Sequence, residues 1–234
     1  MTESSMNNIP NLEPNLEEIS AQLDSKNSRD RMLALVALRD VSPTDAVPLI
    51  KKVLYDQNGP IRSMAIFALG LKPTEESYPI LLNLLQSDPD YGIRADAAGA
   101  LGYLEDGRAF EPLVRAFYED TDWLVRFSAA VSLGNLRDSR AHDVLIQALE
   151  SEEIVIQQGA IAALGEIGDL TALDQILNFA QASDWLVRQS LANALGNLPS
   201  EKSIAALNYL AKDSNRQVAQ AAQYSLEKLA PSSP

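Results

Sequence analysis

A recurring pattern of apolar and small residues runs along almost the whole chain. Each central copy begins with an apolar residue, continues through small residues, and ends in Leu-Gly, as in the segment from Val125 to Gly134. A leucine anchors every copy, and successive anchors lie 31 or 32 residues apart: Leu38, Leu69, Leu101, Leu133, Leu164, Leu195 and Leu226. A period of this length, kept through seven copies, is typical of a repeat protein.

Each copy is predicted to form a helix with one buried stripe. In the fourth copy the apolar and small residues recur at a period of about 3.6 residues, namely at Val125, Ala129, Ser132, Leu133 and Leu136. Small residues in this stripe favour a close approach of neighbouring helices. Three copies also follow an aspartate at the position that caps a helix N-terminus: Asp90, Asp122 and Asp184.

A shorter, leucine-rich segment precedes each copy and predicts the first helix of a pair. Pro48, Pro79 and Pro112 are expected near the starts of such helices, where a missing N–H costs little. A single helix pair cannot bury its own apolar faces, whereas stacked pairs bury a continuous core. The sequence therefore predicts an all-α fold, an α-solenoid expected to coil as a right-handed superhelix of about seven helix hairpins.

The predicted repeat domain spans residues 15–230. Its end copies carry Arg39 and Glu227 where the central copies have Gly, as expected of capping repeats. Residues 1–14 and 231–234 are expected to be disordered tails.

The repeated line resembles HEAT-like repeats, in particular the short subclass named after phycobilisome lyases. That subclass has the line Val-Arg-x-x-Ala-Ala-x-Ala-Leu-Gly-x-Leu, which the segment from Val125 to Leu136 matches almost intact. It also has an Asp-x-Arg-Ala turn, which occurs at residues 106–109 and 138–141. The resemblance covers residues 15–229, nearly the whole chain.

The resemblance implies a function in binding proteins. Compact members of the subclass are cyanobacterial: subunits of bilin lyases, the phycobilisome-degradation protein, and an IscA-interacting HEAT-repeat protein. All are thought to act by gripping partner proteins. The resemblance therefore implies a non-catalytic scaffold with a phycobiliprotein or an IscA-type protein as its partner. The alternative is a lyase subunit that attaches or removes a linear tetrapyrrole, in which case a bilin would be bound.

Composition and charge exclude several classes of function. The chain has no Cys, which removes disulfides and thiolate ligands or nucleophiles. Its net charge of −13 argues against a nucleic-acid partner. No apolar run reaches the ~18 residues that suggest a membrane helix, and the first 14 residues lack the features of a signal peptide. We therefore expect a cytoplasmic protein with no membrane insertion.

Candidate catalytic and metal-binding groups are few. His142 is the only histidine and has no recognisable nucleophile motif, so it is interpreted as a surface helix residue. The segment from Asp88 to Gly92 does not fit a calcium loop, because Gly and Glu are missing at positions six and twelve. We predict no catalytic residue, no metal site and, outside the lyase alternative, no cofactor.

An arginine recurs at one position of the repeat, with Gln157 interrupting the series: Arg31, Arg62, Arg94, Arg126 and Arg188. We favour a structural interpretation, in which each arginine pairs with an acid of its own or a neighbouring turn, such as Asp56, Asp88 or Asp120. The other interpretation is a ladder that binds anions. Under the lyase alternative, Arg94 or Arg126 would contact bilin propionates and Asp96 the pyrroles.

The second helices of such arrays usually line the concave side. In the N-terminal half, the face opposite the buried stripe carries apolar residues, which predict a partner-binding surface: Met32, Val36, Met64, Phe67, Leu71, Tyr103, Phe127 and Val131. In the C-terminal half this face is polar. Trp123 and Trp185 each start a second helix, where they either pack the turn or line a rim of the binding surface.

Overall fold

The computed structural model describes residues 15–230, and the regular secondary structure in that range is entirely helical. The first helices of the pairs are α1 (Leu16–Leu23), α3 (Pro43–Ile50), α5 (Ser77–Ser87), α7 (Phe110–Glu119), α9 (His142–Leu149), α11 (Leu173–Leu177) and α13 (Glu201–Leu210). The second helices are α2 (Ser28–Ala37), α4 (Gly59–Gly70), α6 (Tyr91–Tyr103), α8 (Trp123–Asn135), α10 (Ile154–Ile167), α12 (Trp185–Leu195) and α14 (Arg216–Leu229). The two expected tails lie outside the described residues.

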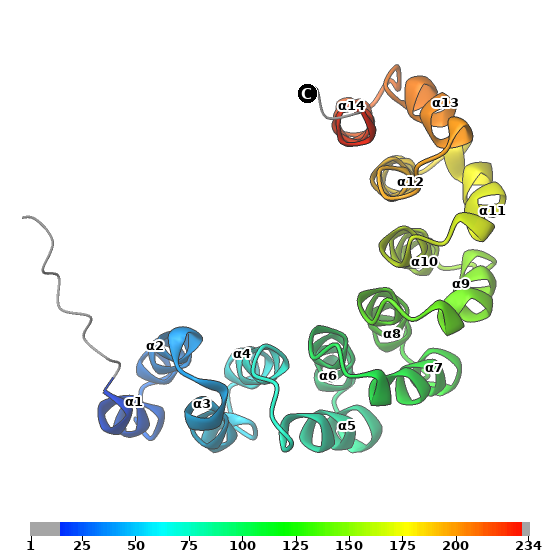
Figure 1. Cartoon of the computed structure of the whole chain (residues 1–234). Helices are drawn as coiled ribbons and strands as arrows, with labels where there is room; N and C mark the ends of the chain where they lie inside the picture. Colours follow the sequence, from blue (N-terminus) through cyan, green and yellow to red (C-terminus); the bar gives the residue numbers. More distant parts are fainter. Residues whose placement is uncertain (1–14, 231–234) are drawn as a thin grey trace, which may run out of the picture.

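The seven helix pairs follow one another along an open arc, as Figure 1 shows. The second helices form the inner row of the arc and the first helices form the outer row. The predicted α-solenoid is therefore confirmed, and so is the placement of the second helices on the concave side. None of the helices within residues 15–230 is both long enough and apolar enough to cross a membrane.

The predicted caps are confirmed, whereas one predicted helix start is wrong. The side chains of Asp90, Asp122 and Asp184 each accept a hydrogen bond from the backbone N–H two residues ahead, at 2.7–2.9 Å. Pro48, however, lies inside α3 rather than near its start, because Pro43 already occupies the beginning of that helix behind the cap Ser42. A 3₁₀ turn, Lys51–Val53, follows directly after α3.

The Leu-Gly step of each central copy lets neighbouring second helices pack closely. A Cβ built on Gly134 would lie 2.6 Å from the Cα of Ala163 on the next second helix, a distance no side chain tolerates. The same relation holds at four other junctions: Gly70 with Ala100, Gly102 with Ser132, Gly165 with Ala194, and Gly196 with Ser225. Each glycine therefore packs against the small residue that precedes the anchor leucine of the following repeat.

The predicted stripe forms the core of the array. Val125, Ala129 and Leu133 are fully buried, and the same holds for most anchor leucines. Leu136 and the last anchor, Leu226, are only half-buried and pack against the edge of this core. A continuous core of this kind is what a stack of helix pairs requires, since each repeat contacts chiefly its neighbours.

The first repeat is attached to the second by a buried lysine. Lys72 is 9% exposed, and its Nζ donates hydrogen bonds to the carbonyl oxygens of Arg39 and Val41 at 2.7 and 2.5 Å. These carbonyls follow the end of α2, where the partial negative charge of a helix C-terminus favours a cation. Arg39 stands where the central repeats have Gly, so the lysine supplies a contact that the missing Leu-Gly step does not.

Candidate partner-binding surface

The recurring arginines join each repeat to the next. Arg94 donates two parallel hydrogen bonds to Asp120 at 2.8 and 3.0 Å, and a third to the carbonyl oxygen of Asp88 at 3.0 Å. Arg31 with Asp56 and Arg188 with Asp213 repeat this geometry. The structural interpretation is confirmed for these arginines, because their guanidinium groups are bound within the array.

Two further arginines also pair with acids of a neighbouring turn. Arg62 pairs with Asp90 at 3.3 Å, while the carboxylate of Asp88 accepts from the backbone N–H of Asp90. Arg126 pairs with Glu153 at 2.5 Å.

The guanidinium groups of Arg94 and Arg126 are therefore occupied by carboxylates. No hydrogen bond or ion pair within residues 15–230 joins either of them to Asp96. The bilin-binding role that the lyase alternative would give these two arginines requires breaking inter-repeat ion pairs.

The ion pairs shift the pKa values of their carboxylates. The hydrogen bonds from Arg94 lower the pKa of Asp120 below its ordinary value, although partial burial opposes the shift. The guanidinium of Arg31 likewise lowers the pKa of Asp56, and that of Arg188 lowers the pKa of Asp213. These aspartates are largely shielded from solvent, with side chains 7–11% exposed. Their charges therefore stabilise the junctions between repeats and are not available to a ligand.

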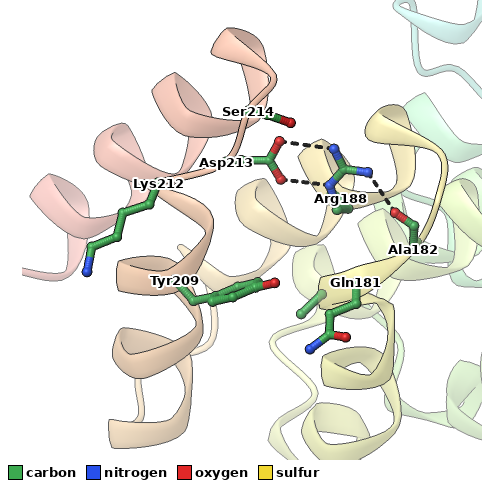
Figure 2. A pocket seen from close by; sticks show the side chains of 8 residues that line it. Gln181, Ala182, Arg188, Tyr209, Lys212, Asp213 and Ser214 are labelled. Carbon is green, nitrogen blue, oxygen red and sulfur yellow. Dashed lines mark hydrogen bonds and ion pairs between the residues drawn. The ribbon is translucent and has the colours of Figure 1, made fainter.

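Clefts next to these pairs recur with the repeat. A cleft of about 410 Å³ lies beside the pair of Arg188 with Asp213. Figure 2 shows this pair, with Tyr209 and Lys212 on one side of it. Similar open clefts of 410–440 Å³ lie beside Asp120 and beside the pair of Arg31 with Asp56. Because they recur at equivalent positions and their aspartates are already paired with arginines, we interpret these clefts as a consequence of stacking.

An apolar surface covers the inner side of the first three repeats. Its members are large apolar side chains between 37% and 55% exposed, and together we call them the apolar inner face: Met32, Leu33 and Val36 on α2, Phe67 and Leu71 on α4, and Tyr103 on α6. Phe67 and Tyr103 meet edge to face with ring centroids 5.6 Å apart. The face is therefore continuous across the junction between α4 and α6.

Three predicted contact residues lie deeper than the rest. Met64 is half-buried against the core. Phe127 and Val131 pack across the junction of α8 with α10, because a Cβ built on Gly159 would lie 3.2 Å from the Phe127 ring and 3.3 Å from Val131. The apolar inner face therefore ends at α8, where the aromatic ring contacts the next repeat.

The inner side of the C-terminal half is polar, with one large apolar exception, and part of it is internally hydrogen-bonded. Asn197 donates to Glu166 at 3.5 Å, and Lys228 donates to Asn197 in turn. The exception is Tyr224 on α14, which is 68% exposed and occupies the repeat position of Phe67. The position of Tyr224 in the repeat could have revealed it from the sequence, although polar residues occupy this face in the copies before it.

The two tryptophans have different environments. Trp123 is 47% exposed, whereas Trp185 is half-buried against the core. Tyr91 and Ile154, at the equivalent first positions of α6 and α10, are also exposed. An apolar row therefore follows the edge of three consecutive inner helices, and Trp123 lies at its centre. Trp185 belongs to the packing.

His142 belongs to a structural contact between outer helices. Its Nδ1 lies 2.5 Å from Asp169, whose other oxygen binds Thr171. At equivalent positions in earlier repeats, Arg140 stacks over Phe110 at 4.1 Å and Arg108 over Tyr78 at 4.4 Å. His142 thus takes the place of those rings. Among residues 15–230, no three His, Asp or Glu side chains converge as a metal site would require.

The family assignment agrees with this geometry. The family model for HEAT repeats matches residues 16–102, 78–154 and 143–227. The chain belongs to the HEAT-repeat family. A comparison with curated protein sequences found no match.

Several solved structures share the fold. The complex of CpcE and CpcF of phycocyanin lyase from Nostoc sp. PCC7120 aligns with a TM-score of 0.60 and 21% identity, over 98% of this chain and 99% of that one. A chain of the Kap95p complex with RanGDP gives a TM-score of 0.57 and 17% identity, over 97% of this chain and 36% of that one. An engineered protein gives a TM-score of 0.52 and 20% identity, over 92% of this chain and 68% of that one. At these identities the likeness concerns the fold alone.

Proposed function

We propose that this HEAT-repeat scaffold binds a partner protein on its apolar inner face. The observation that carries the proposal is the row of exposed apolar side chains on α2, α4 and α6, among them Phe67 and Tyr103. Large apolar residues left in contact with water on adjacent helices favour association, because covering them removes apolar area from water. Aromatic residues are also enriched among those that dominate binding energy.

The repeat architecture supports this use of the inner side. Stacked repeats create an extended concave surface, and that surface is held rigidly by the inter-repeat ion pairs and the glycine contacts. A rigid surface loses little conformational entropy on binding. We further propose a phycobiliprotein or an IscA-type protein as the partner, and a cytoplasmic site of action. The resemblance of the repeat line to the phycobilisome-lyase subclass supports this choice, as does the fold likeness to the CpcE–CpcF complex.

The proposal is tested by removing the two contacting rings together. The double variant Phe67→Ser, Tyr103→Ser removes apolar side chains that are about half exposed, so its circular dichroism should match that of the wild type. Binding of purified phycobiliprotein subunits and of a purified IscA-type protein is then measured by calorimetry. We expect one of them to bind the wild type and to bind the variant at least about tenfold more weakly, a difference of ~1.4 kcal/mol.

The control is Tyr55→Ser, which removes an exposed ring outside the apolar inner face. Tyr103 is preferable to Phe127 in the double variant, because Phe127 contacts Gly159 and its loss would also weaken a repeat junction. Equal affinity of wild type and double variant for the bound partner would contradict the proposal.

The second candidate function is a subunit of a bilin lyase. Its support is the fold likeness to the phycocyanin lyase complex, which extends over nearly the whole of both chains. The test mixes the protein with a bilin and an apo-phycobiliprotein and follows the visible absorbance of the product after denaturation. A covalent adduct that forms only with the protein present would favour the lyase function over simple scaffolding.

A further inference from the structure

One position on the inner side of the array, Gly99, has no side chain. Gly99 lies in the middle of α6, at the repeat position that carries Phe67 on α4 and Val131 on α8. A Cβ built on Gly99 would meet no atom within 4 Å. Glycine inside a helix is unfavourable by roughly 0.5–1 kcal/mol relative to alanine, so a packing or functional reason is expected.

The other glycines in the body of the inner helices are explained by packing. Gly102, Gly134 and Gly165 each face a small residue of the next helix at less than 3 Å, and Gly159 contacts the ring of Phe127. Gly99 has no such neighbour. It leaves a gap in the row of apolar side chains, with Phe67 on one neighbouring helix and Val131 on the other.

A carboxylate stands beside this gap. Asp96 is three residues before Gly99 on the same face of α6, where side chains are about 5–6 Å apart. It is half-buried, and no hydrogen bond or ion pair links its side chain to another side chain of residues 15–230. The equivalent positions on α4 and α8 carry Met64 and Ser128, which bring no positive charge.

We infer that Gly99 and Asp96 form a receptor for one lysine or arginine side chain of the partner, set within the apolar inner face. This inference rests on the proposed function and specifies the partner segment: apolar residues that flank a single basic residue. The aliphatic stem of a lysine or arginine covers apolar surface while its charged end reaches the carboxylate. The gap at Gly99 provides room for that stem between Phe67 and Val131.

The same carboxylate gives selectivity. A partner that buries Asp96 without a cation leaves an unpaired charge in a desolvated place, which weakens binding strongly. A basic residue there forms a charge-assisted hydrogen bond instead. The face therefore rejects purely apolar segments and selects those with one basic residue in register.

The test uses a phage-displayed library of random 16-residue peptides, selected on the intact protein. Binders are retained only if they fail to bind the double variant Phe67→Ser, Tyr103→Ser, and their affinities are then measured with synthetic peptides. We expect the retained peptides to share a lysine or arginine between apolar residues. Replacing that residue with norleucine should weaken binding about tenfold or more, in line with the loss of a charge-assisted hydrogen bond.

Three variants of the protein test the two residues directly. Asp96→Asn should weaken the same peptides about tenfold, whereas Asp143→Asn, on the outer helix α9, should leave them unchanged. Selection on Asp96→Lys should yield peptides with Asp or Glu in place of the basic residue. Gly99→Leu should weaken binding by filling the gap, yet raise the melting temperature, since leucine favours a helix more than glycine does. Loss of folding cannot produce that last combination.

The outcomes separate this inference from the proposed function. Retained peptides without a basic residue, or with equal affinity for wild type, Asp96→Asn and Gly99→Leu, would overturn the receptor while leaving the apolar inner face as a binding surface. A selection that yields no peptide dependent on Phe67 and Tyr103 would overturn both.

Discussion

Arg94 and Asp120 are held together by two parallel hydrogen bonds, although they belong to different repeats and lie 26 residues apart in the chain. Their side chains are 18% and 11% exposed, so the pair is largely shielded from solvent. The arginine also binds the carbonyl oxygen of Asp88 in its own loop. One side chain therefore fixes both the loop before its helix and the contact with the next repeat.

Replacing Arg94 with Gln should destabilise the array by about 1–3 kcal/mol. Glutamine keeps the bond to the loop carbonyl, as Gln157 does with Ser151 at 2.8 Å, but leaves Asp120 without its cation. The expected cost lies between that of an exposed ion pair and that of breaking a buried one. Urea unfolding followed by circular dichroism measures it. Arg39→Gln serves as control, because the pair of Arg39 with Asp40 is 77% exposed on both sides and should contribute little.

The ion pairs also predict how stability depends on pH. Hydrogen bonds from Arg31, Arg94 and Arg188 lower the pKa values of their partner aspartates in the folded state. The unfolded chain therefore binds protons more readily. The stabilisation is complete well above the ordinary aspartate pKa of 3.8, and it is lost as the pH falls toward and below that value.

Unfolding experiments from pH 7 to pH 3 should show a plateau followed by a decline below about pH 5. The decline should be shallower in Arg94→Gln, which removes one of these contributions. Parallel curves for the variant and the wild type would show that the pair does not contribute to the acid sensitivity.

Much of the fold could be predicted from the sequence, because the period, the caps and the helix pairs are local signals. The pairing of the recurring arginines with acids of neighbouring turns was also predicted, with Asp120 among those acids. The exposure of single side chains on the inner helices could not be predicted, since it depends on residues of the next repeat. Phe127 was expected on the free surface, yet it contacts Gly159 in the following helix. Trp123 and Trp185 share the same local sequence, and only their neighbours in space distinguish exposure from packing.

Close packing at the Leu-Gly step predicts a strong effect of one added methyl group. Gly134→Ala would place a Cβ 2.6 Å from the backbone of Ala163, so the two helices must move apart. Overpacking of this kind costs typically about 1–3 kcal/mol, enough to outweigh the gain in helix propensity. Thermal unfolding measures the loss. Gly107→Ala is the matched control, because a Cβ there meets nothing within 4 Å and should leave stability unchanged or slightly raised.

The junction between the fifth and sixth repeats predicts a stabilising substitution. Gln157 occupies the arginine position there but reaches no carboxylate of the sixth repeat. Asp184 stands in that repeat where Asp90 stands in the third, and Asp90 caps Gly92 with one oxygen while its other oxygen pairs with Arg62. Gln157→Arg should therefore form an ion pair with Asp184 without disturbing its cap on Leu186.

The expected gain is up to about 1 kcal/mol, as for a partly exposed ion pair with good geometry, and it should diminish in high salt. Urea unfolding at low and high ionic strength measures both effects. Gln158→Arg adds the same charge one residue further along α10, on a different side of the helix, and should give no comparable gain. Equal stability of Gln157→Arg and Gln158→Arg at low salt would contradict the predicted ion pair with Asp184.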